Sequence, residues 1–249
     1  MNIRDARGVR AGAAVVLAAL LAGCSGGAAG GEGAKGPEGL TAAEACGGFA
    51  SAAPVTTALE AVVGSEHFED DRSKPDKAIG RLRDDAAAPW ADSYRPQPVR
   101  YCGLRGVEGS RKDLRIEVGA VGKGPYLGPE LAKSVTSYAT GLEAFASSGS
   151  GRLYFSCRLD APALPLVVEA VVRGPADVPQ TDLRHRTRLI TLANAAARQV
   201  SAKLGCEGDG LATGVPKTVP APSSAQSPSS APSPQSSQST RSARQAPSS

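Results

Sequence analysis

The two histidines, His67 and His185, are the side chains of this sequence that could serve as a general base in hydrolysis. A serine nucleophile needs such a base beside it and a third group that orients the base. Ser148-Gly149-Ser150-Gly151 lacks the G-x-S-x-G pattern of a nucleophile elbow. It also precedes a predicted strand, whereas an elbow follows one. We therefore interpret Ser148 to Gly151 as a turn and keep a hydrolase that uses His67 or His185 as the alternative function.

Two other segments resemble ligand sites only in part. The run Glu66 to Asp71 is rich in carboxylates but lacks the alternating ligands and central glycine of an EF-hand loop, so a solvated loop is the better interpretation. Gly122 to Gly128 follows a predicted strand as phosphate-binding loops do, but Pro125 removes a needed N–H and the spacing fits no known loop. Without a Cys-x-x-Cys or Cys/His cluster a zinc site is also disfavoured. We predict no metal and no cofactor.

The strongest candidate on the surface is a basic cluster, Arg184, Arg186 and Arg188, with His185 between them. The cluster lies in the first turns of a predicted helix, where the macrodipole disfavours cations. Arg184 and Arg188 share a face and repel one another slightly. Such a placement indicates an anion-binding site for an acidic partner, ligand or lipid head group. The alternative is that these arginines pair with carboxylates elsewhere in the fold.

Cys24 is the residue whose chemistry the sequence predicts most directly. It follows a start that contains three arginines and an apolar run from Ala11 to Leu21, which has the length of a signal-peptide core and is too short to span a bilayer. The ending Leu21-Ala22-Gly23-Cys24 resembles the lipobox of bacterial lipoproteins. That resemblance implies a diacylglycerol on the Cys24 sulfur, cleavage just before Cys24, and a lipid anchor on the outer face of the cell membrane.

Composition divides the chain into four parts. Residues 1–23 are the predicted signal peptide, residues 24–39 a lipidated, glycine-rich tether, and residues 207–249 a disordered tail, clearly Ser/Pro-rich from about Val215. Residues 40–206 then form a single domain. The formal charge is +4 for the whole chain. The signal peptide carries three arginines and one aspartate, which leaves the mature protein near +2 and does not indicate nucleic-acid binding.

Hydrophobic periodicity predicts helices at both ends of this domain. Thr41 and Glu44 form a capping box for a first short helix, and further helices begin near Pro54 and Pro75. A long helix runs from Asp182 to Leu204 with Thr181 as its cap. Its buried stripe consists of Leu189, Leu192, Ala193, Ala196, Val200 and Leu204.

Between these helices the period changes to that of strands. The expected strands are residues 99–105, 113–121, 152–159 and 166–173, the last of them central because both of its faces are apolar. Residues 131–145 are ambiguous, and we expect a helix in their first half only. The fold class is therefore α+β, an antiparallel sheet of about four strands covered by helices. This order, with its Leu-Gly-Cys ending, is similar to actinobacterial secreted lipoproteins of no assigned activity, which implies a location and no chemistry.

Four cysteines remain once Cys24 carries lipid, and an even number outside the cell implies two disulfides. Three pairings are open. We favour Cys46 with Cys206, because both lie at the ends of covering helices, and Cys102 with Cys157, because both lie in strands. Strand alternation speaks against the second pair, since Cys102 could face away from Cys157.

Two functions remain after this survey. The first is a non-enzymatic binding or interaction module of the cell envelope, with the membrane and an envelope protein or acidic ligand as partners. The second is the envelope hydrolase. A histidine in a concave pocket within reach of a serine or carboxylate would favour the hydrolase.

Overall fold

A computed structural model describes residues 39–87, 96–109, 112–122, 124, 126–175 and 177–220. The predicted signal peptide, Cys24 and nearly all of the tether lie outside these residues. The described residues belong to one unit, Pro37–Ser249. None of the helices in these ranges is long and apolar enough to cross a membrane.

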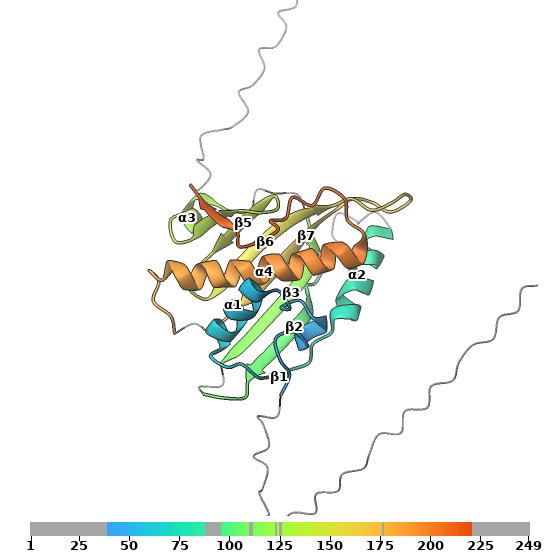
Figure 1. Ribbon diagram of the computed structural model, residues 1–249. Helices are drawn as coiled ribbons and strands as arrows, with labels where there is room; N and C mark the ends of the chain where they lie inside the picture. Colours follow the sequence, from blue (N-terminus) through green and yellow to red (C-terminus); the bar gives the residue numbers. More distant parts are fainter. Residues whose placement is uncertain are drawn as a thin grey trace, which may run out of the picture. The chain divides into compact units, whose positions relative to one another are not determined.

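One antiparallel sheet of eight strands forms the centre of the fold (Figure 1). Its order is β1-β2-β3-β7-β6-β5-β4-β8. The strands are β1 (Phe68–Asp70), β2 (Val99–Gly106), β3 (Asp113–Val121), β4 (Thr136–Ala139), β5 (Glu143–Ala146), β6 (Ser150–Cys157), β7 (Leu166–Arg173) and β8 (Lys217–Val219). The α+β class and the central place of β7 are confirmed. The prediction of about four strands is wrong, because β1, β4, β5 and β8 have only three or four residues each and are too short to show a period.

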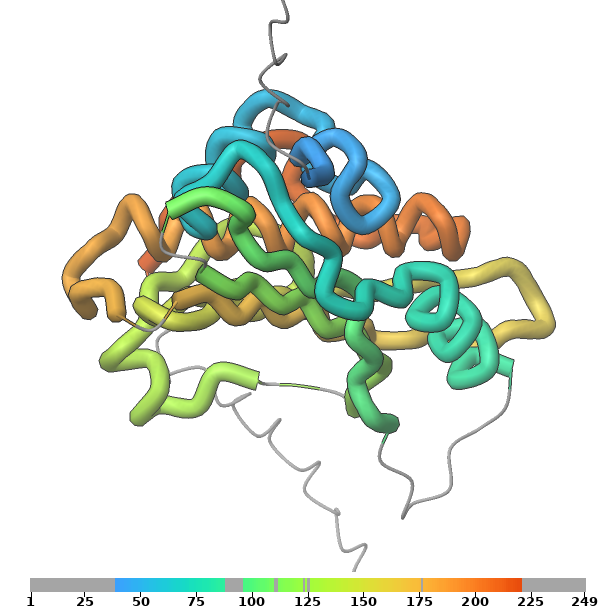
Figure 2. The backbone as a smooth tube through the Cα atoms, turned by 90° about the horizontal axis from the view of Figure 1, so that it is seen from below, coloured from blue at the N-terminus to red at the C-terminus, as the bar shows by residue number. Residues whose placement is uncertain are grey.

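Two helices, α1 (Ala53–Val63) and α4 (Leu183–Leu204), cover the same side of the sheet (Figure 2). The predicted stripe of α4 is buried throughout. It packs against β6 and β7, whose residues Phe155 and Val168 are fully buried. Gly151 of β6 allows the close approach of α4, since a Cβ there would lie 2.9 Å from the carbonyl carbon of Leu189. The core therefore lies between the sheet and these helices.

The helix boundaries follow local chemistry. Gly64 ends α1 and Gly205 ends α4, both in the left-handed conformation as predicted. The third helix, α2 (Pro75–Ala87), begins at the expected proline. The cap of α4 is a correction, since Asp182 rather than Thr181 accepts the His185 N–H. Asp182 is the cap because it lies three residues before His185, and an N-cap side chain accepts a hydrogen bond from the backbone N–H two or three residues later.

The ambiguous region contains one short helix, α3 (Pro129–Ala132), followed by β4 and β5. The predicted helix over the first half of residues 131–145 is therefore wrong beyond Ala132. Thr136 and its neighbours extend instead because β4 pairs with β5 on one side and with β8 on the other. The segment before β4 packs on the far side of the sheet, where Leu127, Phe145 and Tyr154 form a second small cluster.

The folded part of the chain continues past Cys206 to Pro220, which corrects the predicted start of the tail. Asn194 of α4 donates to the carbonyl of Ala212 at 2.8 Å, and β8 then adds the edge strand beside β4. These contacts need no periodic apolar residues, so composition does not reveal them. Residues 221–249 lie outside the described residues.

Both disulfides are present, but the favoured pairing is wrong. Cys46 bonds Cys102, and Cys157 bonds Cys206. β3 and β7 lie between β2 and β6. Three strand spacings of about 4.8 Å then place Cys102 and Cys157 at least about 14 Å apart, too far for a disulfide. The remaining candidates are local: Cys46 lies in a 3-10 turn, η1 (Ala45–Gly47), beside β2, and Cys206 follows α4 at the end of β6.

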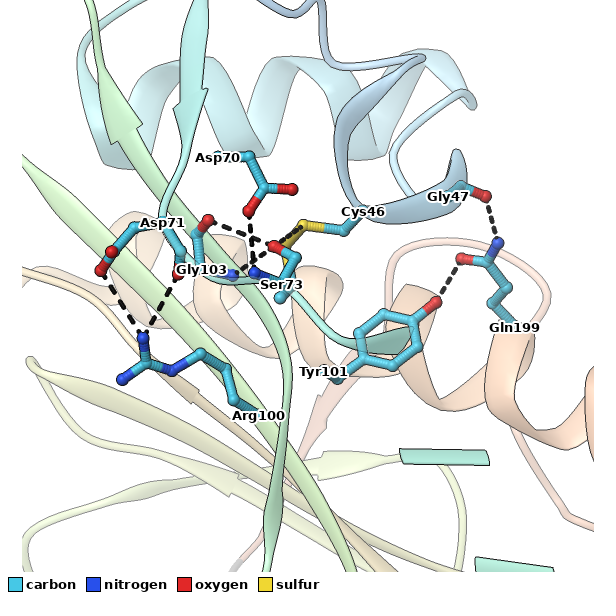
Figure 3. Close-up of a disulfide and its surroundings, with 10 residues drawn as sticks. Cys46, Gly47, Asp70, Asp71, Ser73, Arg100, Tyr101, Gly103 and Gln199 are labelled. Atoms are coloured by element: carbon cyan, nitrogen blue, oxygen red, sulfur yellow. Dashed lines mark hydrogen bonds and ion pairs between the residues drawn. A yellow bond between two sulfur atoms is a disulfide. The ribbon is translucent and has the colours of Figure 1, made fainter. Parts of the chain in front are cut away.

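Figure 3 shows how the N-terminal segment is joined to the sheet around Cys46. The Ser73 hydroxyl lies 3.2 Å from the Cys46 sulfur and accepts the Gly103 N–H at 2.9 Å. The Tyr101 hydroxyl donates to Gln199 of α4 at 2.7 Å, and Gln199 in turn donates to the Gly47 carbonyl. The disulfide thus lies in a network that ties η1, β2 and α4 together.

Candidate anion-binding site

The basic cluster lies where α4 begins. Asp182 caps the helix by accepting the backbone N–H of His185 at 2.9 Å. This hydrogen bond lowers the pKa of the Asp182 carboxyl. The cap therefore places one negative charge at the helix start, and three arginines follow it within six residues.

Arg186 is engaged in the fold. One Nη atom donates to the Thr136 hydroxyl at 3.1 Å, and the other donates to the Gln180 carbonyl. Beside it, the hydroxyls of Tyr138 and Thr187 lie 3.2 Å apart. These contacts join α4 to β4, so Arg186 holds the structure together and is not placed to receive a ligand.

Arg184 and Arg188 differ from Arg186. Arg184 is exposed and Arg188 is partly exposed. Over the described ranges, neither guanidinium has a carboxylate within ion-pair distance. The interpretation that they pair with acids elsewhere in the fold thus finds no support in this part of the chain. The two side chains lie one helical turn apart, and only the Asp182 carboxylate, from beyond ion-pair distance, attracts Arg184.

His185 lies between these arginines in the sequence of α4 and is 4% exposed. Its Nε2 atom is buried and has no hydrogen-bond partner in the structure. Burial lowers the pKa of His185; the charges of Arg188 and Lys112 lower it further, while Asp182 and the Ser148 backbone act in the opposite direction. The ring is therefore neutral at pH 7 and is surrounded by more positive than negative charge.

Lys112 and the turn at Ser148 are the residues of this region that sequence reasoning missed. Lys112 directly precedes β3, and Ser148 lies in the turn between β5 and β6. The nearest carboxylate to Lys112, that of Asp177, is 3.9 Å from its Nζ. No sequence spacing links either residue to α4, because the sheet order alone brings them together.

His67 lies in different surroundings, beside a pocket of about 410 Å³ whose lining includes Glu60, Glu66 and Glu108. Its Nδ1 is 3.5 Å from a Glu108 carboxylate oxygen. The nearby Ser65 hydroxyl donates to the His67 backbone carbonyl at 2.6 Å and not to the ring. The histidine thus has a carboxylate neighbour, as the hydrolase hypothesis requires, but no hydroxyl oriented for attack.

The other two candidate loops have structural roles in the described chain. Glu69 and Asp70 lie in β1, and no group of three or more potential ligands in the described ranges could hold a metal ion. In the glycine-rich loop, the backbone N–H groups of Tyr126 and Leu127 donate to the Glu143 carboxylate at 3.0 and 3.1 Å. The loop binds an anion, as phosphate loops do, but that anion is the protein's own side chain.

Comparisons with protein-family models, with curated proteins and with solved structures find no match to this chain.

Proposed function

We propose that this protein is a lipoprotein, anchored through diacylated Cys24 to the outer face of the cell membrane. Its folded part serves as a non-enzymatic binding module of the envelope. The ligand carries phosphate or carboxylate groups and binds at the start of α4. The observation that carries the proposal is the pair Arg184 and Arg188, two cations with no carboxylate within ion-pair distance in the described chain.

The charge distribution supports this choice of ligand. The pocket beside His67 is lined by three glutamates and no cation, so it repels an acidic ligand. At the start of α4, by contrast, the three cations Arg184, Arg188 and Lys112 outnumber the two nearby carboxylates, those of Asp182 and Asp177. An acidic ligand is therefore directed to the start of α4 and away from the pocket beside His67.

The geometry favours a binding module over the hydrolase. Catalysis by a serine requires its hydroxyl to bond the ring of the base. In the described residues, neither imidazole forms such a bond, and the Nε2 of His185 is buried away from solvent. His67 has only the Glu108 carboxylate beside it.

The anchor is tested by fractionating cells that express Cys24→Ser. The wild-type protein should be found in the membrane fraction, with an intact mass that includes a diacylglycerol on Cys24. The variant should accumulate as an uncleaved precursor or be released. Unmodified Cys24 in membrane-bound protein would overturn this half of the proposal.

Binding is tested with immobilised inorganic polyphosphate as the probe. The double variant Arg184→Gln/Arg188→Gln should bind about tenfold more weakly, since it loses two charge-assisted contacts. The matched control, Lys77→Gln/Lys217→Gln, removes the same charge from two exposed lysines of α2 and β8 and should bind as the wild type does. Equal binding by both double variants would show that the start of α4 is not the site.

A further inference from the structure

The start of α4 combines an excess of cations with a buried base. Neither Arg184 nor Arg188 has a carboxylate within ion-pair distance in the described residues, although Asp182 attracts Arg184 from farther away. Lys112, whose Nζ lies 3.9 Å from the Asp177 carboxylate, acts on the same region from the β2–β3 connection. His185, 4% exposed, is the buried base, and its Nε2 has no acceptor. Cations at a helix start are by themselves an ordinary surface feature. The buried imidazole without a partner for Nε2 is a second, independent observation, because buried polar groups normally have a hydrogen-bond partner.

The groups around the ring determine what its protonation would cost. Two cations face it, Arg188 from α4 and Lys112 from the β2–β3 connection. One anion faces it, Asp182, whose carboxylate already accepts the helix cap bond. From the β5–β6 turn, only the backbone of Ser148 interacts with the ring. An imidazolium here would be repelled by two charges and would bury an Nε2–H without an acceptor.

An anion bound between Arg188 and Lys112 would change this balance. Its negative charge offsets the repulsion that both cations exert on the ring, and this effect acts through space without requiring contact with the buried Nε2. We infer that anion binding at the start of α4 is coupled to protonation of His185, so that the site binds phosphate-type anions more tightly in acid. This inference rests on the proposed function, because it regulates the same site.

Thermodynamic linkage gives the expected size of the coupling between anion binding and protonation of His185. If a bound anion raises the titration midpoint of His185 by about one pH unit, the protonated protein binds that anion about tenfold more tightly than the neutral protein. The reciprocal must hold: acidification through the midpoint tightens binding by the same factor.

The experiment is an NMR titration of the mature protein with sulfate as the probe, because sulfate keeps its charge from pH 5 to pH 8. The chain has only two histidines, so the imidazole signals are few, and His67→Gln assigns them. The His185 midpoint is measured in sulfate and in chloride at equal ionic strength. We expect a rise of about one pH unit in sulfate, a smaller rise in Arg188→Gln or Lys112→Gln, and the full rise in Lys77→Gln.

The source of the anion is separated by a second arm. Phosphatidylglycerol vesicles and phosphatidylcholine vesicles replace sulfate, and a shift with phosphatidylglycerol alone supports a lipid head group as the ligand. A shift with sulfate supports a soluble anion.

Two outcomes would overturn the inference and are distinguishable. If sulfate or vesicles bind, seen as shifts of the α4 backbone signals, but the His185 midpoint is unchanged, the coupling is absent while the binding function stands. If neither probe binds at pH 5 or at pH 7.5, both the coupling and the proposed function fail.

Discussion

Removing one disulfide should destabilise the protein by an amount that the loop length determines. Cys157 and Cys206 are 49 residues apart, and Cys46 and Cys102 are 56 apart. The chain-entropy model then gives a loss of about 4 kcal/mol for either pair when both cysteines become alanine. Alanine is a better replacement than serine. Three of the four cysteines are buried and Cys206 is half-buried, and a serine hydroxyl at a buried position would need a hydrogen-bond partner.

The arrangement of the two loops makes the prediction sharper. They follow one another along the chain and do not overlap, so each constrains the unfolded chain independently. The two losses should therefore add to about 8 kcal/mol. A loss of this size is comparable to the whole stability of an ordinary domain, so the protein without either disulfide should be largely unfolded or marginal. Nested loops, as in the pairing that sequence favoured, would not give additive losses.

Urea denaturation of the mature protein without reductant measures each free energy of unfolding. The wild type, the two double variants and the variant without all four cysteines complete a cycle. A loss below about 1 kcal/mol for either pair, or a combined loss far from the sum, would refute the reasoning. Non-reduced peptide mapping is the independent check, and a peptide joining Cys46 to Cys206 would overturn the observed pairing.

Four other perturbations test separate parts of the structure. The folded-state pKa of His185 lies below its ordinary value, so the unfolded state takes up the proton first as the pH falls. The free energy of unfolding should therefore decrease as the pH drops below about 6.5. Denaturation measured over this pH range should show a smaller decrease for His185→Gln. Gly151→Ala should cost about 1–3 kcal/mol in urea denaturation, because the added methyl meets the α4 backbone, and an unchanged midpoint would show that the helix can move away. Asp182→Ala should lower the melting temperature through loss of the α4 cap, whereas a neutral result would place the cap elsewhere. A chain ending at Cys206 should melt well below one ending at Pro220, since it lacks β8 and the partner of the Asn194 amide; equal melting would restore the earlier domain boundary.

Sequence predicted the elements that are long enough to show a period or that carry a cap. β3 and β7 match the predicted limits, because β3 alternates apolar and polar residues and β7 is apolar for most of its length. Gly205 closes α4 as expected, with the Cys206 N–H bonded to the Ser201 carbonyl at 3.0 Å. Of the predicted capping box only one half forms: the Glu44 carboxylate accepts the Thr41 N–H at 2.9 Å, but the expected helix is the 3-10 turn η1, whose N-cap is Glu44.

The wrong disulfide pairing and the residues missed around His185 share one physical cause, which is dependence on strand order. β7 enters between β3 and β6, and this insertion separates Cys102 from Cys157. It also brings Lys112 and the Ser148 turn to His185, which no spacing along the chain indicates. The candidate site was therefore predictable as a group of arginines on α4, whereas the separate role of Arg186, which bonds Thr136 of β4, was not.

The two ends of the described chain lie at opposite edges of the sheet, and the disulfides determine how the protein would carry tension. Leu40 bridges the outer side of β1, and β8 forms the other edge. A pull between Leu40 and Pro220 would pass through Cys46 directly into β2, and would leave β6 through Cys157 to Cys206. Of the 180 residues between these ends, the closed loops of 56 and 49 are held back, which leaves 75 that could extend. The stretched segments contain β3, β4, β5, β6, β8 and most of β2, whereas α1, α2, β7 and α4 lie within the closed loops and outside the stretched path.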